Sequence, residues 1–199
     1  MHQPNRSSLH PIGRALPLLL LAGGCGILPG TVIPGRRRPV APSDQTRQAR
    51  IAGEVTRIDP VTSLPRELSG TVSGSFSGDY QEEILDVYFD QTGTPIAGLS
   101  RSQFTFVGTQ AGTLTTLNLI SVTEMIVVMD EAGEPILDAQ GNPMVTGLRS
   151  AATGEIIHGD GAFSGAKGTL HSDSVIMFAS GASGLGTLDT QLDVQLSGG

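Results

Sequence analysis

The chain has 199 residues, of which 38% are hydrophobic and 4% aromatic, with no tryptophan. This length suits one domain with a leader and a linker, and so few aromatic residues predict an aliphatic core. The formal charge of −7 is unevenly divided, with +4 on residues 25–66 and −13 on residues 67–199. The acidic part repels nucleic acid and anionic membrane surfaces, so we expect neither as its partner.

The amino terminus has the features of an export signal. Arg6 and Arg14 are the only charged residues before an apolar run of eight residues at positions 15–22. A helix that spans a bilayer needs about 20 residues, so this run is too short to cross one. Its length is typical of the hydrophobic region of a signal peptide.

The residues after this run, Leu21-Ala22-Gly23-Gly24-Cys25, resemble the lipobox of bacterial lipoproteins. The resemblance implies that residues 1–24 are cleaved off and that the Cys25 thiol carries lipid. Membrane lipid would then be a partner, and the protein would lie in the cell envelope, on the periplasmic side of the outer membrane in a Gram-negative bacterium. A plain secretion signal is the alternative. It is weakened because Cys25 is the only cysteine, and an unpaired thiol is a liability in an oxidising compartment.

Residues 25–66 are rich in proline, glycine and arginine, which predicts an extended tether to the membrane. The basic run Arg36-Arg37-Arg38 would either lie on anionic headgroups or stay solvated. The apolar residues Ile51, Val55, Ile58 and Val61 leave open that part of this segment lies against the following domain.

Apolar and polar residues alternate from about Glu67 onward. Ten positions alternate at 68–77 and six at 85–90, which predicts strands with one buried face. Further strands are predicted at 104–107, 113–119, 120–129, 170–179 and 188–196. The chain has no long helical period after residue 25, so residues 67–197 are predicted to form one all-β domain.

Three segments share the pattern D-x-x-G-x-P followed by an apolar residue, and they begin at Asp90, Asp130 and Asp138. An aspartate that binds its own backbone, a glycine with positive φ and a terminal proline predict hairpin turns. A calcium loop would need oxygen ligands at alternate positions and a late glutamate, which these segments lack.

Acidic residues occur on two predicted strands. Glu124 shares a strand face with apolar residues, so it is a possible cavity residue, unless it lies at a strand end or bulge and reaches water. A second group of acids hints at a carboxylate pair, but we interpret it as a solvated strand face. This group contains Asp79, Glu82, Glu83, Asp86 and Asp90.

The run G-x-G-x-F-x-G-A-x-G at residues 159–168 resembles the glycine-rich hairpin of the dirigent and allene oxide cyclase superfamily. A nucleotide-binding loop would open a helix, whereas here a strand follows. The resemblance implies an eight-stranded antiparallel barrel, and 130 residues suffice for one. A two-sheet β-sandwich has the same strand pattern and is the alternative fold.

No known catalytic motif is found, and we expect no cofactor. His158 and His171 flank the hairpin, but no ligand spacing supports a metal site, so we expect exposed histidines. The preferred function is an envelope lipoprotein with a non-catalytic β domain that binds a small hydrophobic ligand or an envelope protein, or has a structural role. The alternative, implied by the resemblance, is a barrel enzyme, an isomerase or cyclase, that acts on a hydrophobic small molecule. Its catalytic residues are not assigned.

Overall fold

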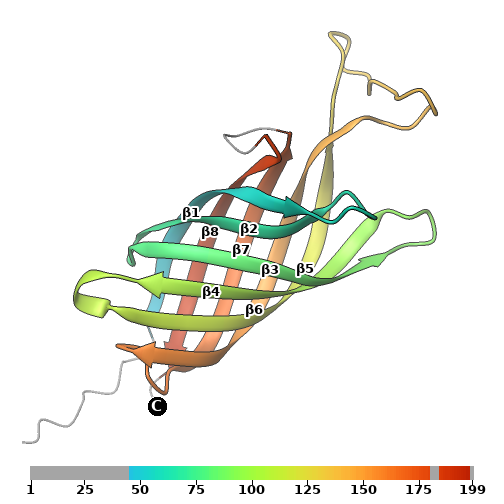
Figure 1. Cartoon of the computed structure of the whole chain (residues 1–199). Helices are drawn as coiled ribbons and strands as arrows, with labels where there is room; N and C mark the ends of the chain where they lie inside the picture. The colour runs from blue at the N-terminus through green and yellow to red at the C-terminus, as the bar shows by residue number, and fades with distance from the viewer. Residues whose placement is uncertain (1–44, 180–183, 198–199) are drawn as a thin grey trace, which may run out of the picture. The chain divides into compact units, whose positions relative to one another are not determined.

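The computed structural model describes residues 45–179 and 184–197, and these form a closed antiparallel barrel of eight strands (Figure 1). Each strand pairs with the next in the chain, and the first pairs with the last. The barrel is confirmed and the sandwich alternative is wrong. The strands are β1 (Gln45–Ile58), β2 (Pro65–Gly74), β3 (Gly78–Phe89), β4 (Pro95–Phe106), β5 (Gly112–Val127), β6 (Val145–Gly161), β7 (Lys167–Phe178) and β8 (Gly186–Ser197). One 3₁₀ turn, η1 (Gly108–Gln110), joins β4 to β5.

The strand β1 lies in the segment that was predicted to be a tether. Ile51 pairs with Val72 of β2 and Thr190 of β8, and it is 1% exposed. Val55 is fully buried. The predicted start of the domain at residue 67 is therefore wrong, and the barrel begins at Gln45. The signal segment, Cys25 and the arginine run lie outside the described residues.

The error has a physical origin in the outer face of β1. This face carries Arg50 and Arg57, which pair with acids on neighbouring strands: Arg50 with Asp189, and Arg57 with Glu67 at 2.6 Å. A strand whose solvent face is basic resembles a charged linker in composition, although its inner face is apolar. The strand β6 was not predicted either, because small residues dominate its sequence.

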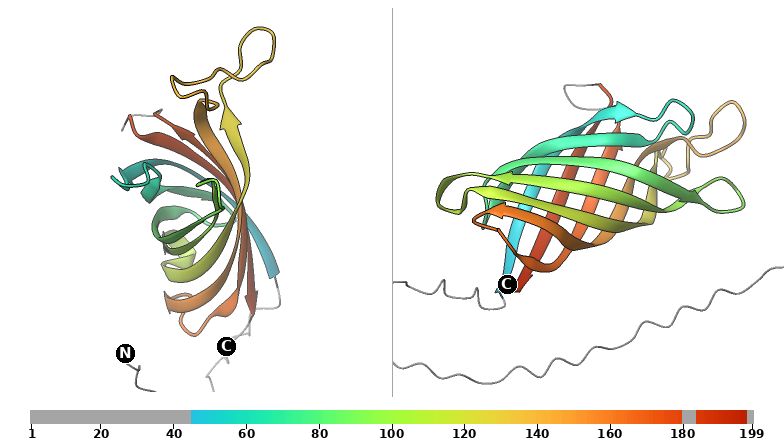
Figure 2. Two further views of the ribbon diagram at one scale, coloured as in Figure 1. Left: turned by 90° about the vertical axis from the view of Figure 1, so that its right-hand side faces the viewer. Right: turned by 60° about the horizontal axis from the view of Figure 1, so that its bottom comes forward.

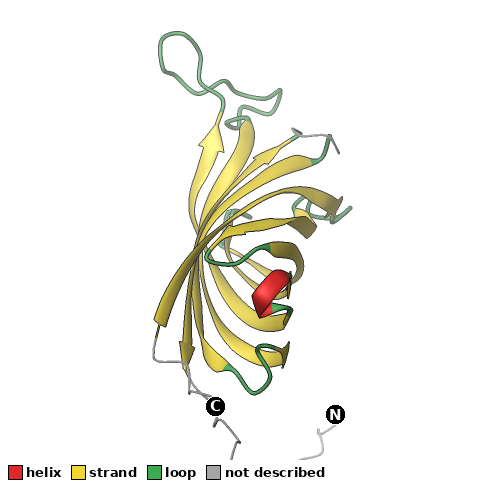
Figure 3. Ribbon diagram, turned by 90° about the vertical axis from the view of Figure 1, so that its left-hand side faces the viewer, coloured by secondary structure: helices red, strands yellow, loops and turns green. Residues whose placement is uncertain are grey.

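One end of the barrel is closed by aromatic side chains. The ring of Phe106 lies 4.8 Å from that of Phe76 and 5.0 Å from that of Phe163, and all three are at most 4% exposed. Phe163 belongs to the glycine-rich hairpin, which is confirmed as a turn between β6 and β7. A side chain on Gly159 would overlap with the Phe163 carbonyl oxygen. The glycines therefore allow Phe163 to fold back into the barrel. The turn η1 lies at the same end (Figure 3).

The opposite end carries the three D-x-x-G-x-P segments, which are confirmed as turns. In each, the first aspartate accepts backbone hydrogen bonds of 2.8–2.9 Å from the residues two and four positions later. The glycines have φ of +83°, +82° and +86°. The backbone N–H groups hold the pKa of Asp138 below its ordinary value.

The second and third of these turns form an arm, residues 128–144, that projects beyond the wall between β5 and β6 (Figure 2). Backbone hydrogen bonds join Val128 to Ile136 and Met144, so the arm is a small folded unit. Met129 and Leu137 are more than half exposed. In the part of the chain that the structure describes, no helix is long and apolar enough to cross a membrane.

Candidate functional site

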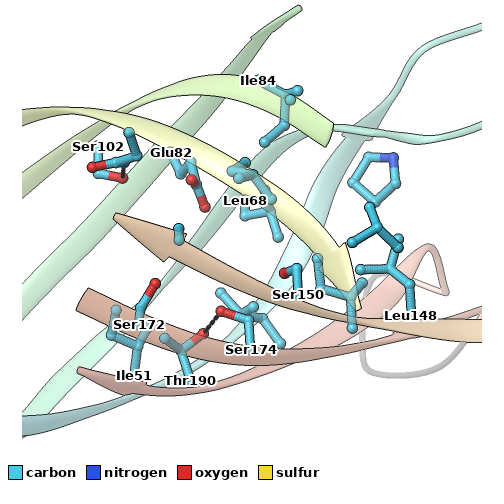
Figure 4. Close-up of a pocket in the computed structure, with 18 of the residues that line it drawn as sticks. Ile51, Leu68, Glu82, Ile84, Ser102, Leu148, Ser150, Ser172, Ser174 and Thr190 are labelled. Carbon is cyan, nitrogen blue, oxygen red and sulfur yellow. Dashed lines mark hydrogen bonds between the residues drawn. The ribbon is translucent and has the colours of Figure 1, made fainter. Parts of the chain in front are cut away.

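The barrel encloses a cavity of about 80 Å³ between the aromatic plug and the opposite end (Figure 4). Aliphatic side chains from seven strands form most of its wall: Ile51, Leu68, Ile84, Ile120, Val122, Leu148, Leu170, Ile176, Leu188 and Leu192. Leu64, Val87 and Pro95 line it near the β1–β2 and β3–β4 turns, and we call this the mouth of the cavity. Most of the wall is therefore apolar, and the few polar groups in it determine what chemistry it offers.

Glu82 directs its carboxyl group into the barrel from β3 (Figure 4). It pairs with Leu68 of β2 and Ser102 of β4 across the sheet. Tyr80 Oη donates a hydrogen bond of 2.5 Å to Glu82 Oε2, and Ser100 Oγ donates one of 2.6 Å to Oε1. Each carboxyl oxygen thus accepts a hydrogen bond from a side chain of the barrel itself.

Asn118 of β5 extends this network. Its Nδ2 donates to Ser100 Oγ at 3.1 Å and to Ser102 Oγ at 2.8 Å. Asn118 is 2% exposed, and its Oδ1 has no hydrogen-bond partner. The neighbouring Thr116 Oγ1 is equally buried and also lacks one. Buried polar atoms are nearly always paired, so two such atoms at alternate positions of β5 are unusual.

Burial determines the protonation of the site. Removal from water raises the pKa of Glu82, although its hydrogen bonds from Ser100 and Tyr80 oppose that change. Burial, followed by the nearby Glu82 charge, raises the pKa of Tyr80 well above its ordinary value. Among the described residues that line the cavity, only these two are titratable, and none is Lys, Arg or His. The carboxyl group therefore has no cationic partner in the wall.

Hydroxyl groups from β6, β7 and β8 line the cavity as well. Ser150, Ser172 and Ser174 belong to its wall together with Thr190 (Figure 4). The Oγ of Ser174 and the Oγ1 of Thr190 are 2.8 Å apart and hydrogen bonded to each other. These hydroxyls offer donors or acceptors to a ligand without adding charge.

The structure places Glu124 outside the cavity. Its side chain is 60% exposed, and its Oε2 lies 3.0 Å from Arg149 Nε on β6. A β-bulge between Val122 and Glu124 shifts the register, so the side chain turns to the outer face of the barrel. The prediction that Glu124 lines a cavity is therefore wrong, and its alternative, a glutamate at a bulge that reaches water, is confirmed.

Glu82 is the candidate site residue that the sequence interpretation missed. The acidic group on β3 was interpreted as solvated, which holds for Asp79, Asp86 and Asp90 but not for Glu82. The signal was present, since Tyr80, Glu82 and Ile84 lie at alternate positions and share the buried face. The density of acids around Glu82 concealed this alternation.

His158 and His171 are both exposed, as expected, and His171 Nδ1 lies 3.4 Å from Thr153 Oγ1. Across residues 45–179 and 184–197, no group of three or more His, Cys, Asp or Glu side chains is arranged to hold a metal ion.

No protein-family model matches the sequence, and no curated protein matches it. Among solved structures, the chain is similar to the pterocarpan synthase dirigent protein GePTS1, at 13% identity. The match covers 78% of this chain and 86% of that protein, with a TM-score of 0.25. The barrel assignment rests on the strand pairing of this chain itself.

Proposed function

We propose that the protein is a lipid-anchored envelope protein whose barrel binds a small, mainly apolar molecule in its lumen without transforming it. The observation that carries the proposal is the Glu82 carboxyl group, which lies in an apolar cavity within a closed barrel. A buried ionisable group is costly, and an all-apolar lumen of the same shape would avoid that cost. We infer that Glu82 orients a ligand.

The dimensions of the cavity limit what the ligand is. An engineered cavity of about 150 Å³ accommodates benzene, so about 80 Å³ accommodates a polar group with a short alkyl chain. One end of the barrel is closed by Phe76, Phe106 and Phe163. A ligand would therefore enter through the mouth. Leu64, Val87 and Pro95 would contact the part of a longer molecule that extends outward.

Binding of short-chain probes tests the proposal. We expect millimolar 1-butanol or n-butylammonium to bind saturably and to shift the NMR signals of Leu68, Leu148 and Leu170, which line the lumen. Ala152 also lines the cavity, so Ala152→Leu should fill it and abolish these shifts. The neighbouring Thr153 is exposed, and Thr153→Leu is the matched control that should retain binding. If neither probe binds, or if Ala152→Leu binds as well as the wild type, the proposal fails.

A second candidate is an isomerase or cyclase that acts on a hydrophobic small molecule. The observation that favours it is the hydrogen bond between Tyr80 and Glu82, because a carboxyl group of raised pKa is suited to general acid catalysis. Envelope small-molecule extracts incubated with the wild type and with Glu82→Gln distinguish the two. Conversion of a compound by the wild type alone would indicate an enzyme, whereas binding without conversion supports the preferred function.

A further inference from the structure

We propose that the lumen ligand is a small organic ammonium ion, whose nitrogen binds the Glu82 carboxylate and whose alkyl chain points toward the mouth. This inference rests on the proposed function and names the chemical class of the ligand. The inference is based on the charges in the cavity wall and on its hydrogen-bond donors and acceptors.

The hydrogen bonds around Glu82 all point toward its carboxyl group. Tyr80 and Ser100 donate to its two oxygens, and Asn118 donates to Ser100. A carboxylate has about four lone-pair sites, so acceptor capacity remains on both oxygens after these bonds. A ligand that supplies donors fits this remaining capacity, whereas a ligand carbonyl or carboxylate would meet acceptors.

Two further acceptors lie on β5, where Asn118 is linked to the Glu82 carboxyl group through Ser100. Asn118 Oδ1 can only accept, and Thr116 Oγ1 can accept, yet neither has a partner in the structure. An ammonium group has three N–H donors on one compact cation, so it can donate to the Glu82 carboxylate and to further acceptors in the lumen. It would also supply the positive charge that the wall of the cavity lacks.

Aromatic rings flank the same position. Tyr80 and Phe104 both line the cavity, and their ring centroids are 5.2 Å apart. The face of an aromatic ring attracts a cation within about 6 Å. The charged group and the rings therefore favour the same kind of ligand.

The electrostatic field of the negatively charged barrel favours cations as well. The described residues contain seven Lys or Arg against eighteen Asp or Glu, a formal charge of −11. Four of the arginines already pair with acids on the outer wall: Arg50, Arg57, Arg101 and Arg149. A negative field of this kind raises the local concentration of small cations and lowers that of anions.

The pH dependence of the binding affinity distinguishes an ammonium ligand from a neutral one. An ammonium ion binds the ionised carboxylate, so its affinity rises with pH as Glu82 loses its proton. A neutral ligand that accepts a hydrogen bond needs the protonated acid, so its affinity falls with pH. Among the described residues facing Glu82 from β2, β4 and β5, none is titratable, and Tyr80 keeps its proton through neutral pH.

Isothermal titration calorimetry of the full chain with n-butylammonium, 1-butanol and butyrate tests the inference. At pH 8 we expect n-butylammonium to bind about tenfold or more tightly than 1-butanol, because its hydrogen bonds are charge-assisted. We expect no binding of butyrate, and we expect n-butylammonium to bind more weakly at pH 5 than at pH 8.

Two variants complete the test. Glu82→Gln should abolish the preference for the ammonium ion over 1-butanol. The adjacent Glu83 pairs with Arg101 on the outer wall, so Glu83→Gln should change neither affinity. Tighter binding of 1-butanol than of n-butylammonium, or an n-butylammonium affinity that falls with rising pH, would overturn the inference and leave the proposed function standing. If neither probe binds, both are overturned. The pH dependence of n-butylammonium binding to the wild type tests the inference even if Glu82→Gln does not fold.

Discussion

Tyr80 and Glu82 point into the barrel from alternate positions of β3, and the phenol donates a 2.5 Å hydrogen bond to the carboxyl oxygen Oε2. The pair lies between the aromatic plug and the aliphatic cavity. Phe104 connects it to the plug, since its ring lies 5.2 Å from Tyr80 and 5.8 Å from Phe106. The two titratable side chains of the cavity wall are therefore adjacent to each other.

Glu82 should make the stability of the barrel depend on pH. Burial raises its pKa above the ordinary 4.5, so the folded state keeps a proton that the unfolded chain has already lost. The free energy of unfolding therefore falls as pH rises from about 4.5 through the raised pKa. Glu82→Gln lacks this contribution, so its stability relative to wild type should increase across that range. Urea denaturation between pH 4.5 and 8 measures the difference, and a constant difference would contradict the prediction.

Removal of β1 should open the barrel. A chain that begins at Glu67 lacks β1 and leaves the pairing edges of β2 and β8 exposed. We expect it to show no cooperative thermal transition. A chain that begins at Pro39 retains β1 and should melt cooperatively. Circular dichroism of the two chains decides the point, and a cooperative transition in the shorter one would show that β1 is dispensable.

Phe163 should be essential for closing the barrel end. It is 4% exposed and contacts both Phe76 and Phe106, so Phe163→Ala should cost about 3–5 kcal/mol of unfolding free energy. Phe89 is 42% exposed, and Phe89→Ala should cost much less. Chemical denaturation of both variants compares them, and equal losses would show that the plug does not stabilise the fold.

The site should be sensitive to a single methyl group on β6. A Cβ atom on Gly154 would overlap with Asn118 Oδ1, so Gly154→Ala should displace the Asn118 amide and cost about 1–3 kcal/mol. NMR signals of the Asn118 side-chain amide should shift with the loss of stability. Glu155→Ala, on the exposed neighbour, is the control and should leave these signals unchanged. An unshifted amide in Gly154→Ala would show that β6 has room to move.

Lipid attachment at Cys25 predicts where the protein is found. Cys25→Ala removes the thiol that the lipobox would present for acylation, so the variant should move from the membrane fraction to the soluble fraction. Fractionation followed by immunoblotting measures the change, and mass spectrometry of the wild type should show the added mass on Cys25. Unchanged partitioning of the variant would refute the anchor.

The sequence by itself predicted the class of the fold and its local details. The alternation in β8, the D-x-x-G-x-P turns and the glycine-rich hairpin depend on residues close together in the chain, and each is confirmed. Such features need no knowledge of distant contacts, because strand period and turn conformation are local properties.

Only the tertiary structure decided where the barrel begins and which acid enters it. Arg50 and Arg57 of β1 form ion pairs with Asp189 of β8 and Glu67 of β2, and these partners become neighbours only when the strands pair. A bulge turned Glu124 outward, whereas closure of the sheet turned Glu82 inward. Alternation divides a strand into two faces, but which face lines the lumen depends on register shifts and on partners far away in the chain.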